Sequence, residues 1–562
     1  MAVIPIDPLK PWGEIEKVIW RRTDRRGRFR IKVRPGSHAV AVSHPWCTGP
    51  EVCRVSVDAG STCALPFPLR LRRGEAWVQG EIRDGEGRPV HGLLGLLPPL
   101  QDPRLNATSV RLAPILSGRY RIAVPPGTYF FFPWAKGWFL PGRWVDVGPG
   151  TRIQDAVLLP EPVKAGRATL RWLRARAVNL DPAEPGSLEP LAGALRPGTV
   201  LALGEMTHGS DEFRQLLHRV VQQWAARGET GAIALEMPIA NGFPVDAYVQ
   251  GRGPEPREAL PLAYRTGEIR EFLRWLRRFN EGRGPRSRFR IHGIDMADPG
   301  SAYRHAAAFY RRHDPDAAAI LHKDLADLGG AGELTFPGDA ARARRWRAAL
   351  ERLRRRLDAP GSPPAANPRT LADQHRVLVA LEQFIPLALD RTQGSRAREQ
   401  AMAENVRWVL GEDGPGGRVL LFAHGGHVAR TLRDPMGWPT LGWHLGKELG
   451  EAYIPVGLTF HRGGFLALES SRAHPAWLPF EVGPEARATL NEALASLHRP
   501  CLLLDLRTAP ADPWLRSPQG LRSIPLDFDP AAPELYLLPA FAKEEWDALL
   551  QLERITPSTP WP

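Results

Sequence analysis

The sequence contains few cysteines and no long apolar run. Its four cysteines, Cys47, Cys53, Cys63 and Cys501, lack the paired spacing of a zinc finger, so a cysteine metal framework is excluded. Cys47 and Cys53 are close enough to pair in an exported protein, although so low a count fits a reducing compartment as well. No run of about 18 apolar residues occurs, and the first residues lack the pattern of a signal peptide. We expect no membrane span and a cytoplasmic protein, or an exported one if the amino terminus is truncated.

Two common functional motifs are also missing. No Gly-x-Ser-x-Gly segment occurs, which disfavours a serine nucleophile of the α/β-hydrolase type. Arginine clusters at 21–30 and 352–356 come without a zinc-finger spacing, a stacking-aromatic module or a Walker-type lysine loop. The net charge of +13 comes almost entirely from arginine and fits a general compositional bias as easily as a binding surface. We therefore predict no nucleic-acid partner.

What the sequence does contain is ordinary globular material for more than one core. Hydrophobic residues make up 43% and charged residues 24% of 562 residues. A single hydrophobic core stops growing near roughly 250 to 300 residues, so two or more domains are needed. We expect three.

The first 160 residues contain an internal repeat, in which Gly27–Gly36 matches Gly118–Gly127. Alternating apolar residues predict a half-buried strand in each copy, at Phe29, Ile31 and Val33 and at Tyr120, Ile122 and Val124. These units resemble the carboxypeptidase regulatory-like β-sandwich, whose opening strand is similar to Val78–Val90. The resemblance implies structural or adhesive modules, a partial one at 1–70 and another at 71–163. The first lacks an opening strand of its own.

From about residue 165, short apolar runs alternate with long helical patterns, which is typical of an α/β domain with a mainly parallel sheet and flanking helices. The predicted strands are Thr199–Leu203, Ala232–Leu235, Phe289–Ile294 and Arg418–Phe422, with later ones at Ala452–Phe460 and Cys501–Leu506. Between the third and fourth strands, amphipathic patterns predict helices at Ala302–Arg312, Asp339–Asp358, Thr370–Leu389 and Arg396–Leu410. We interpret this stretch, about 300–412, as a helical insertion that covers the end of the sheet.

Acidic and imidazole side chains follow four of these strands. They are Glu205 and His208, then Glu236, then Asp295, then His424 and His427. The carboxyl ends of strands are where ligands bind in open α/β sheets. Each residue also has a simpler explanation, since Glu236 can cap a helix or pair with an arginine, and Asp295 before a loop is typical of helix capping. Two histidines in one glycine-rich loop, with a Glu-x-x-His in another, together indicate chemistry.

Carboxylates and imidazoles at a partly desolvated sheet edge shift one another's pKa values, so a neutral histidine can serve as a general base. A nearby arginine or protonated histidine can hold the oxyanion that forms when hydroxide adds to an ester carbonyl. The residues therefore favour direct attack by activated water.

Taken in order, these segments resemble the erythromycin esterase family, which also includes proteins of succinoglycan biosynthesis. The resemblance spans about residues 165 to 562, so we expect one catalytic domain over 164–562. The matching segments are Leu203–Gly209, Glu212–Phe213, Ala234–Met237, Val245–Val249, Arg274–Asn280, Gly293–Asp295, Arg398–Val406, Ala423–Val428 and Asp547–Leu550.

The resemblance implies that His208 is the general base and that Glu205 and Glu236 orient it or the water. His424, His427 and Arg398 are implied to bind the substrate carbonyl and leaving group, and we group Asp295 with Arg398. Family members often carry Asn between the two histidines, where this chain has Gly425 and Gly426. The implied substrate is a small ester or lactone, glycosylated ones included, with no cofactor required.

Two alternatives remain open at this level. Glu205, His208, Glu236, His424 and His427 are also suitable ligands for a divalent metal, which would make the protein a metal-dependent hydrolase. The tandem β-rich modules instead favour a carbohydrate-binding or envelope-associated scaffold without activity. The sequence predicts neither the oligomeric state nor the natural substrate.

Overall fold

The chain divides into two compact units, one made mainly of residues 1–163 and the other mainly of residues 164–562. The structure is a computed structural model, and the predicted division into three domains stays a prediction. The described residues are 2–5, 19–20, 23–24, 26, 28–41, 47–48, 53–65, 72–84, 87–97, 111–134, 138–139, 143–157, 159–160, 164–184, 186–330, 339–359, 368–389, 391–412, 417–431, 439–469, 476–484, 489–510, 512–530 and 533–561.

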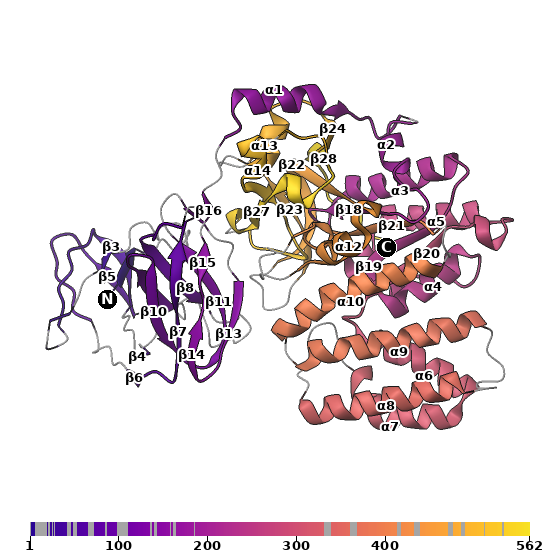
Figure 1. The fold of residues 1–562 in the computed structure, drawn as a ribbon, viewed down its shortest axis with the longest axis horizontal. Helices are drawn as coiled ribbons and strands as arrows, with labels where there is room; N and C mark the ends of the chain where they lie inside the picture. The colour runs from indigo at the N-terminus through magenta and orange to yellow at the C-terminus, as the bar shows by residue number, and fades with distance from the viewer. Residues whose placement is uncertain are drawn as a thin grey trace. The chain divides into compact units, whose positions relative to one another are not determined.

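The first unit consists of β-strands (Figure 1). One four-stranded sheet has the order β2-β1-β3-β5, formed by Ile19–Trp20, Ala2–Pro5, Gly36–Ala41 and Cys53–Val57. A second joins β10 (Arg119–Val124), β7 (Ala76–Arg83), β14 (Gly150–Ile153) and β15 (Ala156–Val157). A third has the order β13 (Arg143–Val147), β11 (Gly127–Trp134), β8 (Gly92–Leu97) and β9 (Arg111–Ile115). Short pairs are β4 (Cys47–Thr48) with β6 (Arg72–Arg73) and β12 (Trp138–Phe139) with β16 (Leu159–Pro160).

One hydrophobic cluster contains residues of both the second and the third sheet, including Val78 and Ile122 from one and Leu94 and Phe131 from the other. The assignment of these strands to a carboxypeptidase regulatory-like sandwich stays a prediction. So does the pairing of Cys47 with Cys53, because their side chains lie outside the described part of the chain.

The two copies of the repeat differ in structure. The second copy forms β10, which pairs with β7, whereas residues 28–35 of the first copy form no strand. The strand predicted at Phe29, Ile31 and Val33 is therefore wrong. Two basic residues lie between these apolar ones and two more flank them, Phe29 is 36% exposed, and within the described residues no strand pairs with this segment.

The second unit is a mixed α/β fold around a ten-stranded sheet (Figure 1). Its main path has the order β17-β24-β28-β22-β18-β21-β19-β20, and β23 and β26 pair with β22. The strands from β28 to β20 run parallel, while β24 is antiparallel to β28. Their bounds are β17 (Val178–Asn179), β18 (Val200–Glu205), β19 (Ala232–Pro238), β20 (Arg290–Asp295), β21 (Val419–His424), β22 (Tyr453–Glu469), β23 (Trp477–Val482), β24 (Cys501–Asp505), β26 (Asp527–Phe528) and β28 (Ala548–Ile555). A separate pair joins β25 (Gln519–Arg522) and β27 (Leu537–Ala540).

All six strands predicted from apolar runs are present, because such runs fit strands that are buried on both faces. Every residue of β18 and β21 is buried. The helices outside the insertion are α1 (Arg167–Arg176), α2 (Glu189–Ala192), α3 (Asp211–Ala226), α4 (Ile239–Val249), α5 (Gly267–Asn280), α11 (Gly425–Val428), α12 (Leu441–Leu449), α13 (Leu490–Ala495), α14 (Pro513–Arg516) and α15 (Ala542–Glu545).

Five consecutive helices lie between β20 and β21, where the insertion was predicted. They are α6 (Pro299–His313), α7 (Pro315–Gly329), α8 (Ala340–Asp358), α9 (Pro368–Leu389) and α10 (Arg391–Glu412). α6 to α9 pack side by side around a hydrophobic cluster of their own (Figure 1). α10 also packs on β19, β20 and β21, so it joins this bundle to the sheet.

The strand order identifies the part of the sheet suited to a ligand. The chain leaves β18 toward β19 on one side, and it leaves β21 toward β22 on the other. Right-handed crossovers then send the following segments to opposite faces, which is the arrangement found at ligand sites of open α/β sheets. β18 and β21 are neighbours, and Glu205 pairs in register with His424 at their carboxyl ends. Among the described residues, no helix has both the length and the apolar composition to cross a membrane.

Candidate active site

The loop after β18 is fixed by a close backbone approach. A Cβ atom on Gly209 would lie 2.0 Å from the carbonyl oxygen of Leu466 in β22, so only glycine fits there. The carbonyl oxygen of Gly209 accepts a hydrogen bond from the Leu466 N–H at 3.1 Å. Ser210 then caps α3 by accepting from the N–H of Phe213. The loop that carries His208 is thereby held between β22 and the start of α3.

Glu205 and His208 form a buried pair supported by an arginine. The His208 Nδ1 atom lies 2.9 Å from Glu205 Oε1, and Arg214 Nη1 donates to the same oxygen at 3.0 Å. Arg214 Nη2 also donates to the His208 carbonyl oxygen at 2.7 Å. The Arg214 guanidinium lies over the rings of Tyr264 and Phe422, at 4.6 and 5.1 Å from their centroids. Glu205 is therefore fixed as an acceptor for the Nδ1 proton of His208.

His424 is held as a neutral ring. The Gly426 N–H donates to its Nδ1 atom at 3.2 Å, so Nε2 carries the proton and donates to the Ile524 carbonyl oxygen at 3.1 Å. Burial, with the neighbouring His208, lowers the pKa of His424 to about 3. Both ring nitrogens are thus occupied. The His424 ring lies 5.1 Å from the His208 ring and 6.4 Å from the His427 ring, measured between centroids.

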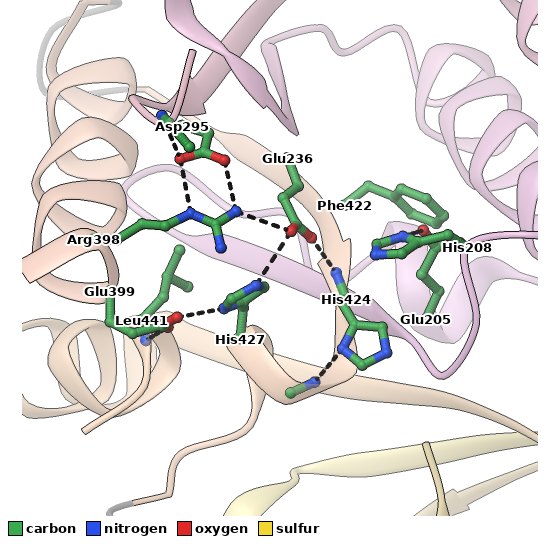
Figure 2. A network of polar contacts seen from close by, with 12 residues as sticks. Glu205, His208, Glu236, Asp295, Arg398, Glu399, Phe422, His424, His427 and Leu441 are labelled. Carbon is green, nitrogen blue, oxygen red and sulfur yellow. Dashed lines mark hydrogen bonds and ion pairs between the residues drawn. The ribbon is translucent and has the colours of Figure 1, made fainter. Parts of the chain in front are cut away.

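Glu236 connects the histidine loop after β21 to the insertion. Its Oε2 atom accepts from the His424 backbone N–H at 2.7 Å, and its Oε1 atom lies 3.2 Å from His427 Nε2. Arg398 Nη2 lies 3.6 Å from the same Oε1 atom. Figure 2 shows the Glu236 carboxylate between these three groups. Burial opposes its ionisation, but His427, His208 and Arg398 outweigh that effect and hold the pKa of Glu236 well below its usual value.

His427 is held as an imidazolium. Its Nδ1 atom lies 2.6 Å from Glu399 Oε1, so each ring nitrogen faces a carboxylate. Burial opposes protonation, but Glu399 and Glu236 outweigh it and raise the pKa of His427 well above its usual value. Glu399 Oε2 accepts from the Leu441 N–H at the start of α12 at 2.7 Å, which fixes the carboxylate.

Arg398 lies beside Glu236 and His427, and Asp295 fixes two of the three nitrogens of its guanidinium. Its Nε and Nη2 atoms donate to the two oxygens of Asp295 at 3.0 and 2.6 Å. Asp295 Oδ1 also accepts from the Met296 and Ala297 N–H groups, and the residue is only 3% exposed. Burial lowers the pKa of Arg398, but Asp295 and Glu236 reverse this and raise it. Asp295 therefore orients Arg398 and has the local turn contacts expected of a capping residue.

The loops after β18 and β21 meet at Gly425. A Cβ atom on Gly425 would lie 2.6 Å from the Met206 Sδ atom in the neighbouring loop. A larger residue at this position would therefore require the Met206 side chain to move.

The seven predicted site residues lie within one connected network at the carboxyl ends of β18 to β21. The network also includes Arg214, Glu399 and the Ile524 carbonyl, which the sequence analysis missed. Glu399 directly follows Arg398, and that adjacency on a helix crossing the sheet end is the signal that was available. Nothing local marks Ile524, which lies 100 residues from His424 in sequence. Among the described residues, no group of three or more histidine, cysteine, aspartate or glutamate side chains is arranged to hold a metal ion.

Comparison with known proteins gives consistent matches over the second unit. A sequence profile described as erythromycin esterase matches residues 226–555, which include every predicted site residue after His208. A protein described as erythromycin esterase type II from Escherichia coli is 23% identical over 313 residues, covering 50% of this chain and 73% of that protein.

Solved structures share the fold. A Bacillus cereus protein superposes with a TM-score of 0.61 at 20% identity, covering 70% of this chain and 98% of its own. A succinoglycan biosynthesis protein gives 0.59 at 21% identity, covering 70% and 100%. An erythromycin esterase mutant in its open conformation gives 0.51 at 14% identity, covering 67% and 94%.

Proposed function

Because the chain belongs to the erythromycin esterase family, whose profile covers residues 226–555, we propose that it hydrolyses an ester or lactone with His208 as the general base. The substrate proposed from the family and from the esterase name of its relative is a small molecule.

The observation that carries the proposal is the state of the three histidine rings. Both nitrogens of His424 are hydrogen-bonded, and both nitrogens of His427 face carboxylates. His208 differs, because its Nε2 atom has no partner among the described residues while Nδ1 is held by Glu205. Of these three rings, only that of His208 presents a nitrogen that can accept a proton from water.

The proposed reaction proceeds without a covalent intermediate. Nδ1–H of His208 donates to Glu205, so the lone pair on Nε2 removes a proton from a water molecule as its oxygen adds to the carbonyl carbon. Arg398 Nη1, which has no partner in the described part of the chain, and the positive His427 ring supply charge that stabilises the oxyanion. The tetrahedral intermediate then collapses and breaks the bond between the carbonyl carbon and the leaving oxygen. The leaving oxygen receives the proton that His208 Nε2 removed from water. The products are a carboxylic acid and an alcohol.

The test is hydrolysis of 4-nitrophenyl butyrate and simple lactones by the wild type and a His208→Ala variant. Loss of a positioned general base lowers kcat by about 10²- to 10⁴-fold. His322→Ala is the matched control, because His322 is exposed on α7 and makes no contact with the site. Its rates are expected to equal those of the wild type, and thermal melting checks that all three proteins are folded.

Equal turnover by His208→Ala and the wild type would remove His208 as the base. Absence of hydrolysis by the folded wild type across a broad ester and lactone panel would contradict the proposed activity itself.

A further inference from the structure

A cleft lies next to the network, and its lining residues take no part in the proposed reaction. This cleft of about 850 Å³ is bordered by α4, by α6 and by the segment from Glu258 to Arg265. Asn241, Phe243 and Pro244 line it from α4, and Arg304 and His305 line it from α6.

The cleft begins where the strands of the network end. Pro238, which lines it, lies two residues after Glu236, so their Cα atoms are at most about 7 Å apart. Pro238 also pairs in register with Asp295, the residue that orients Arg398. Asp298, another lining residue, follows Asp295 by three positions. The cleft and the network therefore share the carboxyl ends of β19 and β20.

Part of the lining is apolar and stiff. The Phe243 and His305 rings lie 4.7 Å apart, and Leu260 and Pro244 add to the same surface. Pro244 stands inside α4 and has no N–H, so the carbonyl of Ala240 lacks its usual helical donor. Ala240 also lines the cleft. This combination suits a ligand that is partly carbon chain and partly polar.

Each charged side chain that lines the cleft, except Arg304, has an ion-pair or hydrogen-bond partner among the described residues. Glu258 is shared by Arg257 and Arg265, at 2.5 and 3.6 Å. Asp298 caps α6 by accepting from the Ser301 N–H at 3.0 Å. The Arg304 guanidinium makes no ion pair or hydrogen bond in the described part of the chain.

Two neutral polar groups lie with this cation. Asn241 makes no hydrogen bond with any described residue, and neither does the His305 ring. Burial lowers the pKa of His305 to about 4, so the ring adds no charge at neutral pH. A single unpaired guanidinium with neutral donors beside an apolar surface matches a carboxylate on a short carbon chain.

We propose that this cleft binds a carboxylate carried by the ester substrate, with Arg304 as its ion-pair partner and Asn241 and His305 as hydrogen-bonding neighbours. That the bound molecule is a substrate rests on the proposed esterase function. The carboxylate-binding site itself does not depend on turnover. A carboxylate site in this cleft would favour two kinds of substrate, namely half-esters and esters of carboxylate-bearing alcohols.

Binding is measured first, by calorimetry with monomethyl glutarate and with the neutral dimethyl glutarate. The wild type is expected to bind the monomethyl glutarate anion more tightly than the neutral dimethyl ester. Arg304→Gln is expected to weaken binding of the anion by about three- to tenfold, which is the range for a charged pair that is neither fully exposed nor fully buried. Arg312→Gln is the matched control, since Arg312 is an exposed arginine on the same helix that does not line the cleft. It is expected to bind like the wild type.

Kinetics then distinguish the two places a substrate can carry its carboxylate. The acyl side is probed with 4-nitrophenyl monoglutarate against its methyl ester, and the alcohol side with acetylated 4-hydroxybenzoate against its methyl ester. Arg304→Gln is expected to raise KM for one acidic ester of these pairs by more than it raises KM for the matching neutral methyl ester, because only the acidic ester pairs a carboxylate with Arg304.

Equal binding of monomethyl glutarate by the wild type and Arg304→Gln would overturn the carboxylate site, whatever the esterase assay gives. Binding that depends on Arg304, in a protein that hydrolyses no ester, would instead support the site and remove the proposed function.

Discussion

The three histidines of the network have the same side chain and differ only in what their nitrogens contact. Carboxylates on both sides raise the pKa of His427, whereas burial, together with the neighbouring His208, lowers the pKa of His424 and keeps that ring neutral. His208 has one carboxylate at Nδ1, and its Nε2 atom has no partner among the residues that the structure describes. The three rings thus differ in role, with His427 as the positive charge, His424 as a fixed neutral ring and His208 as the base. These roles follow from partners supplied by five separate segments.

Replacement of Glu399 by Gln tests the charge on His427. One carboxylate is lost from Nδ1, so the pKa of His427 is expected to fall toward its usual value, which NMR titration of the labelled ring would measure. In the wild type the native pKa of His427 is raised above its unfolded value of 6.5. Its stabilising contribution is therefore complete below pH 6.5 and is lost as pH rises through the native pKa.

The difference in unfolding free energy between the wild type and Glu399→Gln is accordingly expected to be about 1 to 4 kcal/mol at pH 6 and to shrink at alkaline pH. Glu404→Gln is the control, because Glu404 lies on the same helix and, among the described residues, forms hydrogen bonds with Gln383 and Gln400 and with no member of the network. A His427 titration that is identical in the wild type and Glu399→Gln would contradict the assignment.

At this scale, the sequence predicted which polar residues meet, because they follow neighbouring strands. It could not predict which nitrogen of which ring is occupied. That depends on Ile524 and Leu441, whose backbone atoms reach the network through tertiary packing and carry no signal in their side chains.

At the scale of elements, apolar runs and helical periodicity identified six strands and four helices of the second unit. The missed helix α7 has buried Ala317, Leu321, Leu325 and Leu328, a helical spacing, and an Asp-Pro start, so its signal was present. β28 was missed for a different reason. It lies between β22 and β24, yet its sequence, Ala548–Ile555, mixes apolar residues with Gln, Glu and Arg and resembles a helix as much as a strand.

The approach of two loops at Gly425 gives a prediction for these elements. A methyl group there would press on the Met206 thioether, so Gly425→Ala is expected to lower the free energy of unfolding by about 1 to 3 kcal/mol, measured with urea. Removing the obstructing side chain in Gly425→Ala/Met206→Ala is expected to destabilise by less than the sum of the single changes.

Gly411→Ala serves as the control for glycine replacement. A Cβ atom there would meet nothing within 4 Å, and the position lies in α10, so the change is expected to be neutral or stabilising by up to about 1 kcal/mol. Additive effects of Gly425→Ala and Met206→Ala would show that the two loops do not constrain each other.

At the scale of the whole molecule, buried neutral histidines make the native state sensitive to acid. Burial lowers the pKa of His218, His292 and His305 to about 4 and, with His208, that of His424 to about 3. The unfolded chain takes up these protons near pH 6.5, whereas the native state does not. Stability is therefore lost as pH falls from 6.5 toward 4.

Asp373 acts in the opposite direction, because burial raises its pKa to about 6 and the native state then binds a proton before the unfolded chain does. It offsets one of the four histidines. Since each uncompensated proton changes stability by about 1.4 kcal/mol per pH unit, the net loss is steepest near pH 5, at about 4 kcal/mol per unit, and becomes smaller toward pH 4, where the native histidines also take up protons. Urea unfolding followed by tryptophan fluorescence at pH 7, 6 and 5 would measure this slope.

A single substitution isolates one of these protons. His292 is buried in β20 against Trp408, away from the reacting groups, so His292→Gln is expected to flatten the slope by about 1.4 kcal/mol per pH unit, whatever it costs at pH 7. The exposed His322 provides the comparison, since His322→Gln changes no buried group and leaves the slope as in the wild type. If His292→Gln and the wild type lost stability at the same rate between pH 6 and 5, the native state would already accept that proton, and the acid sensitivity would have to arise from the carboxylates instead.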